Sequence, residues 1–112
     1  MRKRVLVVCP TGWDERQLAA LPDGPRSRYE LIFDSPSDDE VRWDMNVLGY
    51  VEERAAAPPG RLDGVYSSSD YPGAVAAAAL AEVLRLPGAR PACVLRAGHK
   101  YESRLVQREL DP

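Results

Sequence analysis

Short apolar runs alternate along this chain with longer segments in which apolar residues recur every three or four positions. Apolar runs are centred on residues 5–8, 31–33 and 64–66. The first run, Val5-Leu6-Val7-Val8, is continuous, which is typical of a strand that is covered on both faces. We therefore predict strands over residues 4–8, 29–34 and 64–66.

The segments between and after these runs have helical spacing and recognisable ends. Thr11 with Asp14, and Ser37 with Glu40, match the capping-box spacing. Pro-Asp-Gly-Pro at 22–25 predicts a turn, and Pro87-Gly88 predicts a helix stop with glycine at the left-handed cap. An apolar stripe in the second helix is expected to contain Val41, Met45, Leu48 and Val51. The expected helices cover residues 12–21, 41–57, 72–86, 91–98 and 99–110.

Alternation of strands and helices predicts an α/β fold with right-handed crossovers. We expect a small three-layer Rossmann-like domain. Its mostly parallel sheet should have three or four strands, flanked by helices and followed by C-terminal helices. Such a sheet is smaller than the average of about five to six strands. It also leaves two unprotected edges, so the chain is expected to be a piece of something larger.

The composition of the chain argues against several classes of function. The chain has 112 residues and a formal charge of −2, so it lacks the general basic footprint of a nucleic-acid binder. Its apolar runs are too short for a membrane span or a signal peptide, and the cytoplasm is the expected location. Cys9 and Cys93 match no metal or redox spacing and are expected to be reduced thiols in the core.

Candidate chemistry lies in the turns after the strands, because ligands of open parallel sheets collect at the carboxyl ends of the strands. Neither GxGxxG nor a GxxxxGK[ST] loop is present. The turn at 67–71 offers hydroxyls at a helix start and could seat an anion, unless Ser69 or Asp70 simply caps the helix. His99 is the only histidine and is expected to be a surface or capping residue. Lys100 opens a helix, where a cation opposes the macrodipole, and this placement hints at a ligand phosphate.

One long stretch carries a family resemblance. The run SSSDYPGAVAAAALAEVLRLPGARPACVLRAGHKYESRLVQREL resembles the end of the N-terminal (pre-ATP-grasp) domain of ATP-grasp ligases. Leu86-Pro87-Gly88, Pro91 and Lys100 match that pattern in order and spacing. VLVVCPTGWD near the start is similar to the first strand and loop of the same domain.

The resemblance implies an ATP-dependent carboxylate–amine ligation through an acylphosphate. Residues 1–98 would form the pre-ATP-grasp domain, and residues 99–112 would begin the connection to a missing ATP-grasp catalytic domain, the expected partner. ATP and Mg²⁺ would serve the complete enzyme, with the Mg²⁺ ligands outside this chain, so the chain alone is expected to be catalytically incomplete. The resemblance assigns ATP phosphate to Lys100. It assigns the small-molecule carboxylate and amine substrates to Thr11, Gly12, Ser67, Ser68, Ser69 and Asp70.

Two other hypotheses of function remain. One is a stand-alone flavodoxin-like binding or regulatory module, although a receiver domain would need clustered acids where this chain has Cys9-Pro10-Thr11. The other is an interaction domain that forms a homodimer through a sheet edge or the last helix.

Overall fold

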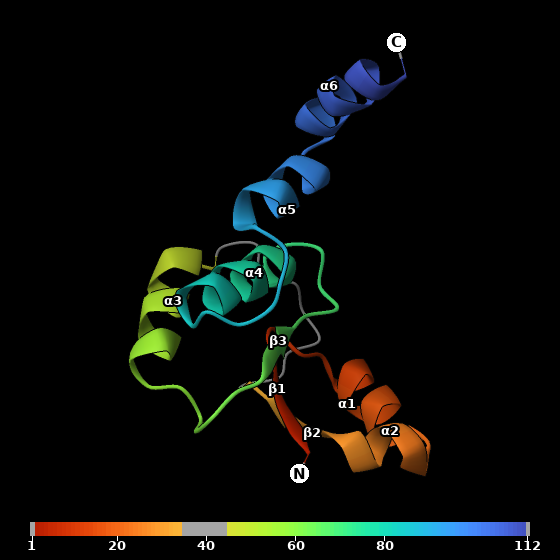
Figure 1. The fold of residues 1–112 in the computed structure, drawn as a ribbon, viewed down its shortest axis with the longest axis vertical. Coiled ribbons are helices and arrows are strands. Elements are labelled where there is room, and N and C mark those ends of the chain that lie inside the picture. The colour runs from red at the N-terminus through yellow and green to blue at the C-terminus, as the bar shows by residue number, and fades with distance from the viewer. Residues whose placement is uncertain (1, 35–44, 112) are drawn as a thin grey trace.

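A three-stranded parallel sheet lies at the centre of the molecule (Figure 1). The computed structural model describes residues 2–34 and 45–111. Both neighbours of the first strand run parallel to it, with Leu6 opposite Ile32 on one side and Val65 on the other. The α/β fold with a parallel sheet is therefore confirmed. The strands, in the spatial order β2-β1-β3, are β1 (Lys3–Val7), β2 (Tyr29–Phe33) and β3 (Gly64–Tyr66).

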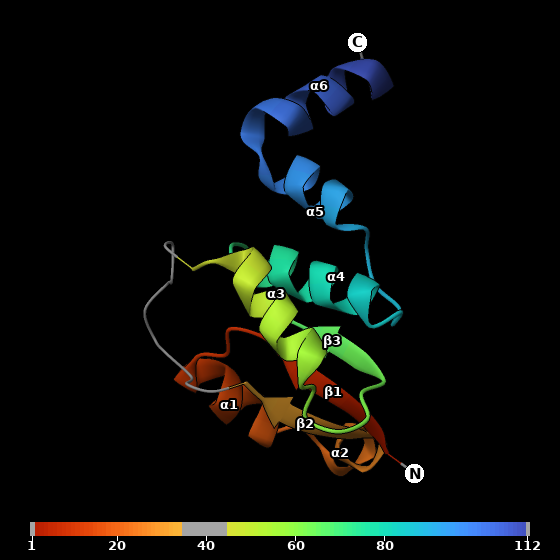
Figure 2. The same ribbon diagram turned by 90° about the vertical axis from the view of Figure 1, so that its left-hand side faces the viewer.

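Helices cover both faces of the sheet, which gives three layers. Figure 2 shows α3 (Val47–Ala56) and α4 (Gly73–Val83) on one face of the sheet. The helices α1 (Gly12–Ala19) and α2 (Asp23–Arg28) lie on the other face. Since successive side chains of a strand point to opposite faces, neighbouring residues of β1 can be buried in different layers.

The main core lies between the sheet and the pair α3 and α4. Leu6 and Val8 pack there against Val51, Ala76 and Leu80, and all of them are buried. Alanine gives α4 a smooth surface, so its backbone can approach the sheet closely. The helix predicted over residues 72–86 is confirmed, with slightly different ends.

The last two helices extend away from this core. We call α5 (Pro91–Gly98) and α6 (Lys100–Leu110) together the arm (Figure 1). No residue of either helix is buried. The predicted starts at Pro91 and Lys100 are both confirmed.

The turn predicted at 22–25 is wrong, because this stretch begins α2. Pro22 precedes the helix and Pro25 lies in its first turn, where backbone N–H groups have no partner within a helix. Neither proline therefore costs a hydrogen bond. The Ser27 hydroxyl donates to the carbonyl of Gly24, which adds a local contact.

The C-terminal end of α4 also differs from the one predicted at Pro87-Gly88. Leu84 caps the helix, and the left-handed residue is Arg85, with φ of 57°, instead of Gly88. The N–H of Leu86 donates to the carbonyl of Ala81, and that of Arg85 to Glu82. These bonds satisfy carbonyls at the helix end as a left-handed cap does. A Cβ on Gly88 would lie 3.3 Å from the Cβ of Ala81, so close approach accounts for glycine there.

The second predicted helix is only partly as expected. Asn46 caps α3 through its side chain, which accepts the N–H of Gly49 at 3.1 Å, so Met45 lies before the helix. Leu48 is 76% exposed and does not join the apolar stripe, whereas Val51 does. The capping box at Ser37 and Glu40 lies outside the described residues.

The expectation that both cysteines lie in the core is wrong for Cys93. Cys93 is exposed on α5, whereas Cys9 is half-buried and packs against the hydrophobic core.

Among the described helices, none combines the length and apolar character needed to span a lipid bilayer.

Candidate functional site

One carboxylate links the loops that follow β1 and β3 at the carboxyl end of the sheet. We call these the first and third loops. Asp14 lies at the start of α1 and is only 4% exposed. Its Oδ2 accepts the N–H of Thr11 at 2.9 Å and the Thr11 hydroxyl at 3.1 Å. Its Oδ1 accepts the hydroxyl of Ser68, from the loop after β3, at 2.7 Å. The predicted capping box is confirmed, and it also fixes one loop to the other.

The charge of Asp14 is stabilised where it lies. Burial opposes ionisation of the carboxyl, but hydrogen bonds from the Thr11 backbone and the Ser68 and Thr11 hydroxyls outweigh it and lower the pKa of Asp14. The group is therefore a carboxylate at neutral pH. Sequence reasoning assigned Asp14 only a capping role, because its bond to Ser68 spans 54 positions.

The third loop is fixed by further bonds. The Ser67 hydroxyl donates to the carbonyl of Val8 at 2.8 Å and accepts the N–H of Ser69 at 3.2 Å. A Cβ on Gly73 would lie 2.2 Å from the Ser67 Oγ and 2.6 Å from the Ser69 Cβ, so only glycine fits there. The loop therefore packs tightly on the start of α4.

The simple capping role predicted for Ser69 or Asp70 is wrong. Pro72 is the N-cap of α4 and no side chain caps this helix. The carbonyl of Ser69 accepts the N–H of Ala74 instead, at 2.8 Å. Asp70 is exposed, so its carboxylate faces solvent beside the helix start.

These bonds change the chemistry expected at this edge. The hydroxyl protons of Ser67 and Ser68 point to a carbonyl and a carboxylate, and that of Thr11 points to the same carboxylate. The Ser67 and Thr11 hydroxyls also accept the N–H groups of Ser69 and Asp14, so the three hydroxyls offer a ligand only their remaining acceptor lone pairs and no donors. Together with the charge of Asp14, this arrangement favours a ligand that donates hydrogen bonds over an anion.

A second polar cluster, missed by sequence reasoning, follows β2. The Arg54 guanidinium binds the carboxylate of Asp34, with Nη2 2.8 Å from Oδ1 and Nε 3.0 Å from both oxygens. The hydroxyl of Tyr50 donates to the same carboxylate, and the guanidinium lies 5.5 Å from the centre of the Tyr50 ring. Burial and the Asp34 carboxylate raise the pKa of Tyr50, and the bond to Asp34 raises that of Arg54. This cluster joins β2 to α3 and holds its charges in place.

A groove lies between the start of α4 and the arm. Its volume is about 520 Å³, within the range of small-molecule sites. Asp70 and Tyr71 line one side, and His99, next to Lys100, lines the other. The remaining lining residues are Val75, Val94, Leu95, Arg96, Gly98 and Glu102.

The sequence-predicted site residues thus fall into two groups. Thr11 and Ser68 meet through Asp14, and Ser67 and Ser69 belong to the same loop. Asp70 belongs to the groove, which His99 at the start of α6 also lines.

The two remaining candidates lie at helix starts. Gly12 is the first residue of α1, and Lys100, which is exposed, is the first residue of α6. His99 caps α6, and its Nδ1 accepts the N–H of Glu102 at 3.4 Å, as a capping residue is expected to do.

The start of α6 is the part of this arrangement that best suits a phosphate. Lys100 and the backbone N–H groups at the start of α6 are suitable partners for a phosphate, apart from that of Glu102, which His99 accepts. Among residues 2–34 and 45–111, no three His, Cys, Asp or Glu side chains group as a metal site.

Comparison with known proteins gives no family for the chain. No protein-family model, no curated protein and no solved structure matches it.

Proposed function

We propose that this chain is the N-terminal, substrate-side domain of an ATP-dependent carboxylate–amine ligase of the ATP-grasp kind. In that role, ATP phosphorylates a carboxylate and an amine attacks the acylphosphate. The catalytic domain, with its Mg²⁺ ligands, is a separate part with which the arm makes contact. Lys100 binds ATP phosphate, and the loops after β1 and β3 face the substrates.

The observation that supports this proposal best is the groove. It has Asp70 of the third loop on one side and His99, the neighbour of Lys100, on the other. A substrate in the groove would therefore lie near the helix start that carries Lys100, the proposed partner of the ATP phosphate. The polar carboxyl end of a parallel sheet is also where open α/β folds bind ligands.

Lys100→Ala tests the proposal in the complete polypeptide that contains this chain. Loss of a charge-assisted hydrogen bond to phosphate costs about 1.5–3 kcal/mol, so the KM for ATP should rise at least about tenfold. Release of ADP, measured with a carboxylic acid and an amine present, gives the rate. Arg108→Ala is the matched control, because Arg108 is an exposed cation in the last turn of the same helix.

An unchanged KM for ATP in the Lys100 variant would contradict the phosphate assignment. The 112-residue chain alone should show weak or no ATP affinity and no turnover, and robust turnover would contradict the two-domain proposal. Continuation of the coding sequence by roughly 200 residues, with a glycine-rich loop and an Asp/Glu…Glu-x-Asn pattern, would support the ligase.

A stand-alone binding or dimerisation module is the second candidate. The exposed apolar side chains of the arm favour it, because Tyr101 is 64% and Leu110 is 81% exposed. Sedimentation velocity over a range of concentrations separates the candidates. Dimers that form without any nucleotide dependence favour the module, whereas a monomer at high concentration counts against it.

A further inference from the structure

The groove between α4 and the arm is apolar in its depth and charged at its rim. Val75 is buried, and Val94 is half-buried beside it, whereas Asp70 and Arg96 are exposed. Leu95 adds a further apolar wall that is open to solvent. A volume of about 520 Å³ accommodates a small organic molecule with an apolar body.

The rim carries more negative than positive charge. Two carboxylates, Asp70 and Glu102, line the groove with a single guanidinium, that of Arg96. Tyr71 also lines it, and the face of an aromatic ring attracts cations. Charge complementarity at this groove therefore favours a cation over an anion.

We propose that the groove binds a small primary ammonium compound with an aliphatic or aromatic body. The body packs on Val75, Val94 and Leu95, and the ammonium group lies at the rim near Asp70 and Glu102. This inference rests on the proposed function only in identifying the compound as the amine substrate. Binding itself needs neither ATP nor another domain.

Titration of the 112-residue chain with three probes of similar shape tests this proposal. The probes are 2-phenylethylammonium, 2-phenylethanol and 3-phenylpropionate, at neutral pH and low salt, followed by amide NMR shifts. The ammonium compound should bind most tightly, by about two- to fivefold over the alcohol for each carboxylate in reach. The propionate should bind most weakly, and the shifts should map to residues 70–75 and 94–102.

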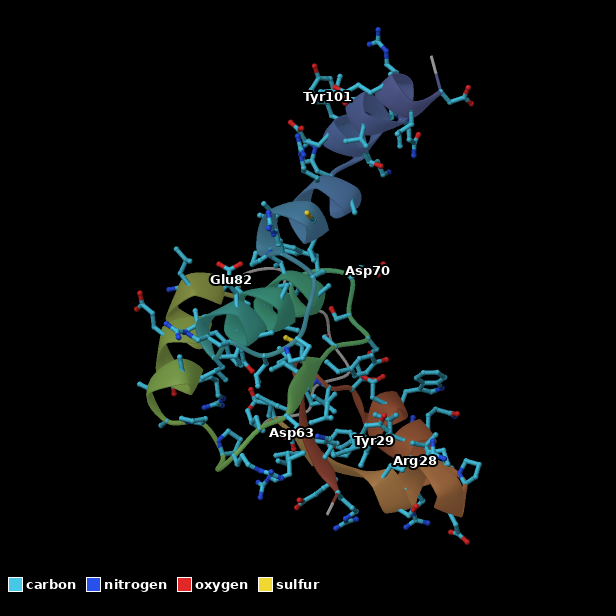
Figure 3. All side chains as sticks on the ribbon, in the orientation of Figure 1. Arg28, Tyr29, Asp63, Asp70, Glu82 and Tyr101 are labelled. Carbon is cyan, nitrogen blue, oxygen red and sulfur yellow. The ribbon has the colours of Figure 1, made fainter. Side chains whose placement is uncertain are left out.

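Substitutions distinguish the contribution of the charged rim to binding from that of the apolar walls. Asp70→Asn and Glu102→Gln should each reduce the preference for the ammonium probe over the alcohol by about two- to fivefold. Leu95→Ala should weaken all three probes alike. Glu82→Gln is the matched control, since Glu82 is an exposed acid near the other end of α4, outside the groove (Figure 3).

Three results would overturn the proposal: equal affinity for the three probes, preference for the propionate, or shifts that map elsewhere. Absence of binding would overturn it too. None of these results bears on the ATP kinetics of Lys100 variants, so failure here and failure of the ligase proposal are distinguishable.

Discussion

The sheet with α3 and α4 fully buries Leu6, Val8 and Leu80, whereas α5 and α6 bury none of their residues. We call the sheet with α1 to α4 the body. The radius of gyration, 15.2 Å, exceeds the roughly 13 Å expected of a compact domain of this length because the arm extends from the body. Hydrophobic burial therefore stabilises the body directly, and the arm depends on its contact with α4. This difference places the groove between a largely buried helix, α4, and an arm without buried residues.

The largest expected difference between the two regions comes from truncating a core leucine. Leu80→Ala removes a completely buried side chain and should lower the free energy of unfolding by about 2–5 kcal/mol. Leu110→Ala, at an exposed position of the arm, should change it by less than about 0.5 kcal/mol. Urea unfolding of both variants measures the contrast, and similar losses would mean that the arm is part of the core.

Glycine positions give a second matched pair. Gly73→Ala would force a Cβ against Ser67 and Ser69, and such overpacking costs about 1–3 kcal/mol. Gly98→Ala meets nothing within 4 Å at the end of α5 and should be neutral or stabilising by up to about 1 kcal/mol. The same unfolding assay applies, and a tolerated Gly73→Ala would show that the third loop is less rigid than described.

Asp14→Asn tests the link between the first and third loops. Loss of the charged acceptor leaves Thr11 and Ser68 with weaker bonds and should cost about 1–3 kcal/mol at pH 7. Asp23→Asn is the control, because Asp23 is an exposed acid in the first turn of α2. Equal stability of the two variants would remove Asp14 from its linking role.

The same carboxyl predicts a pH dependence. Because the folded pKa of Asp14 lies below its ordinary value of 3.8, its ionised form is favoured by folding. The contribution of Asp14 to the free energy of unfolding should be complete above pH 3.8 and should be lost as the pH falls through the lower folded pKa. The stability difference between wild type and Asp14→Asn should therefore shrink in acid below about pH 4, and a constant difference from pH 7 to pH 2 would contradict this.

These loop contacts also show what local sequence could predict. The strand at 64–66 and the starts of α5 and α6 were predictable because apolar runs, Pro91 and the Gly98–Lys100 stretch mark them locally. The capping box of Thr11 was predictable for the same reason. The short α2 was missed because a proline before the helix and another in its first turn, with Asp and Gly between them, match the pattern of a turn.

The rest depended on contacts between distant residues. The bond from Ser68 to Asp14 and the cluster of Asp34, Tyr50 and Arg54 exist only once the sheet has formed. A cap at Ser69 or Asp70 was a reasonable local expectation, but the helix has no side-chain cap. The hydroxyls of Ser67 and Ser68 donate instead to Val8, just after β1, and to Asp14 in α1. The groove could not be predicted, because it depends on how the arm leaves α4.

The smallest expected effect concerns the start of the arm. Lys100→Glu replaces a cation by an anion at the N-terminal end of α6, which the helix macrodipole favours by about 0.3–1 kcal/mol. Hydrogen exchange of α6 amides should slow accordingly, while that of α4 stays unchanged. Slower exchange in both helices would mean that the arm and the body open together.

Native-state hydrogen exchange of the unmodified chain tests the central claim, a rigid body with a separately opening arm, most directly. Amides of α4 should exchange only through global unfolding and should follow the free energy of unfolding as urea is added. Amides of α5 and α6 should exchange faster, through local opening with little dependence on urea. Equal protection of α4 and α6, with the same urea dependence, would contradict this account.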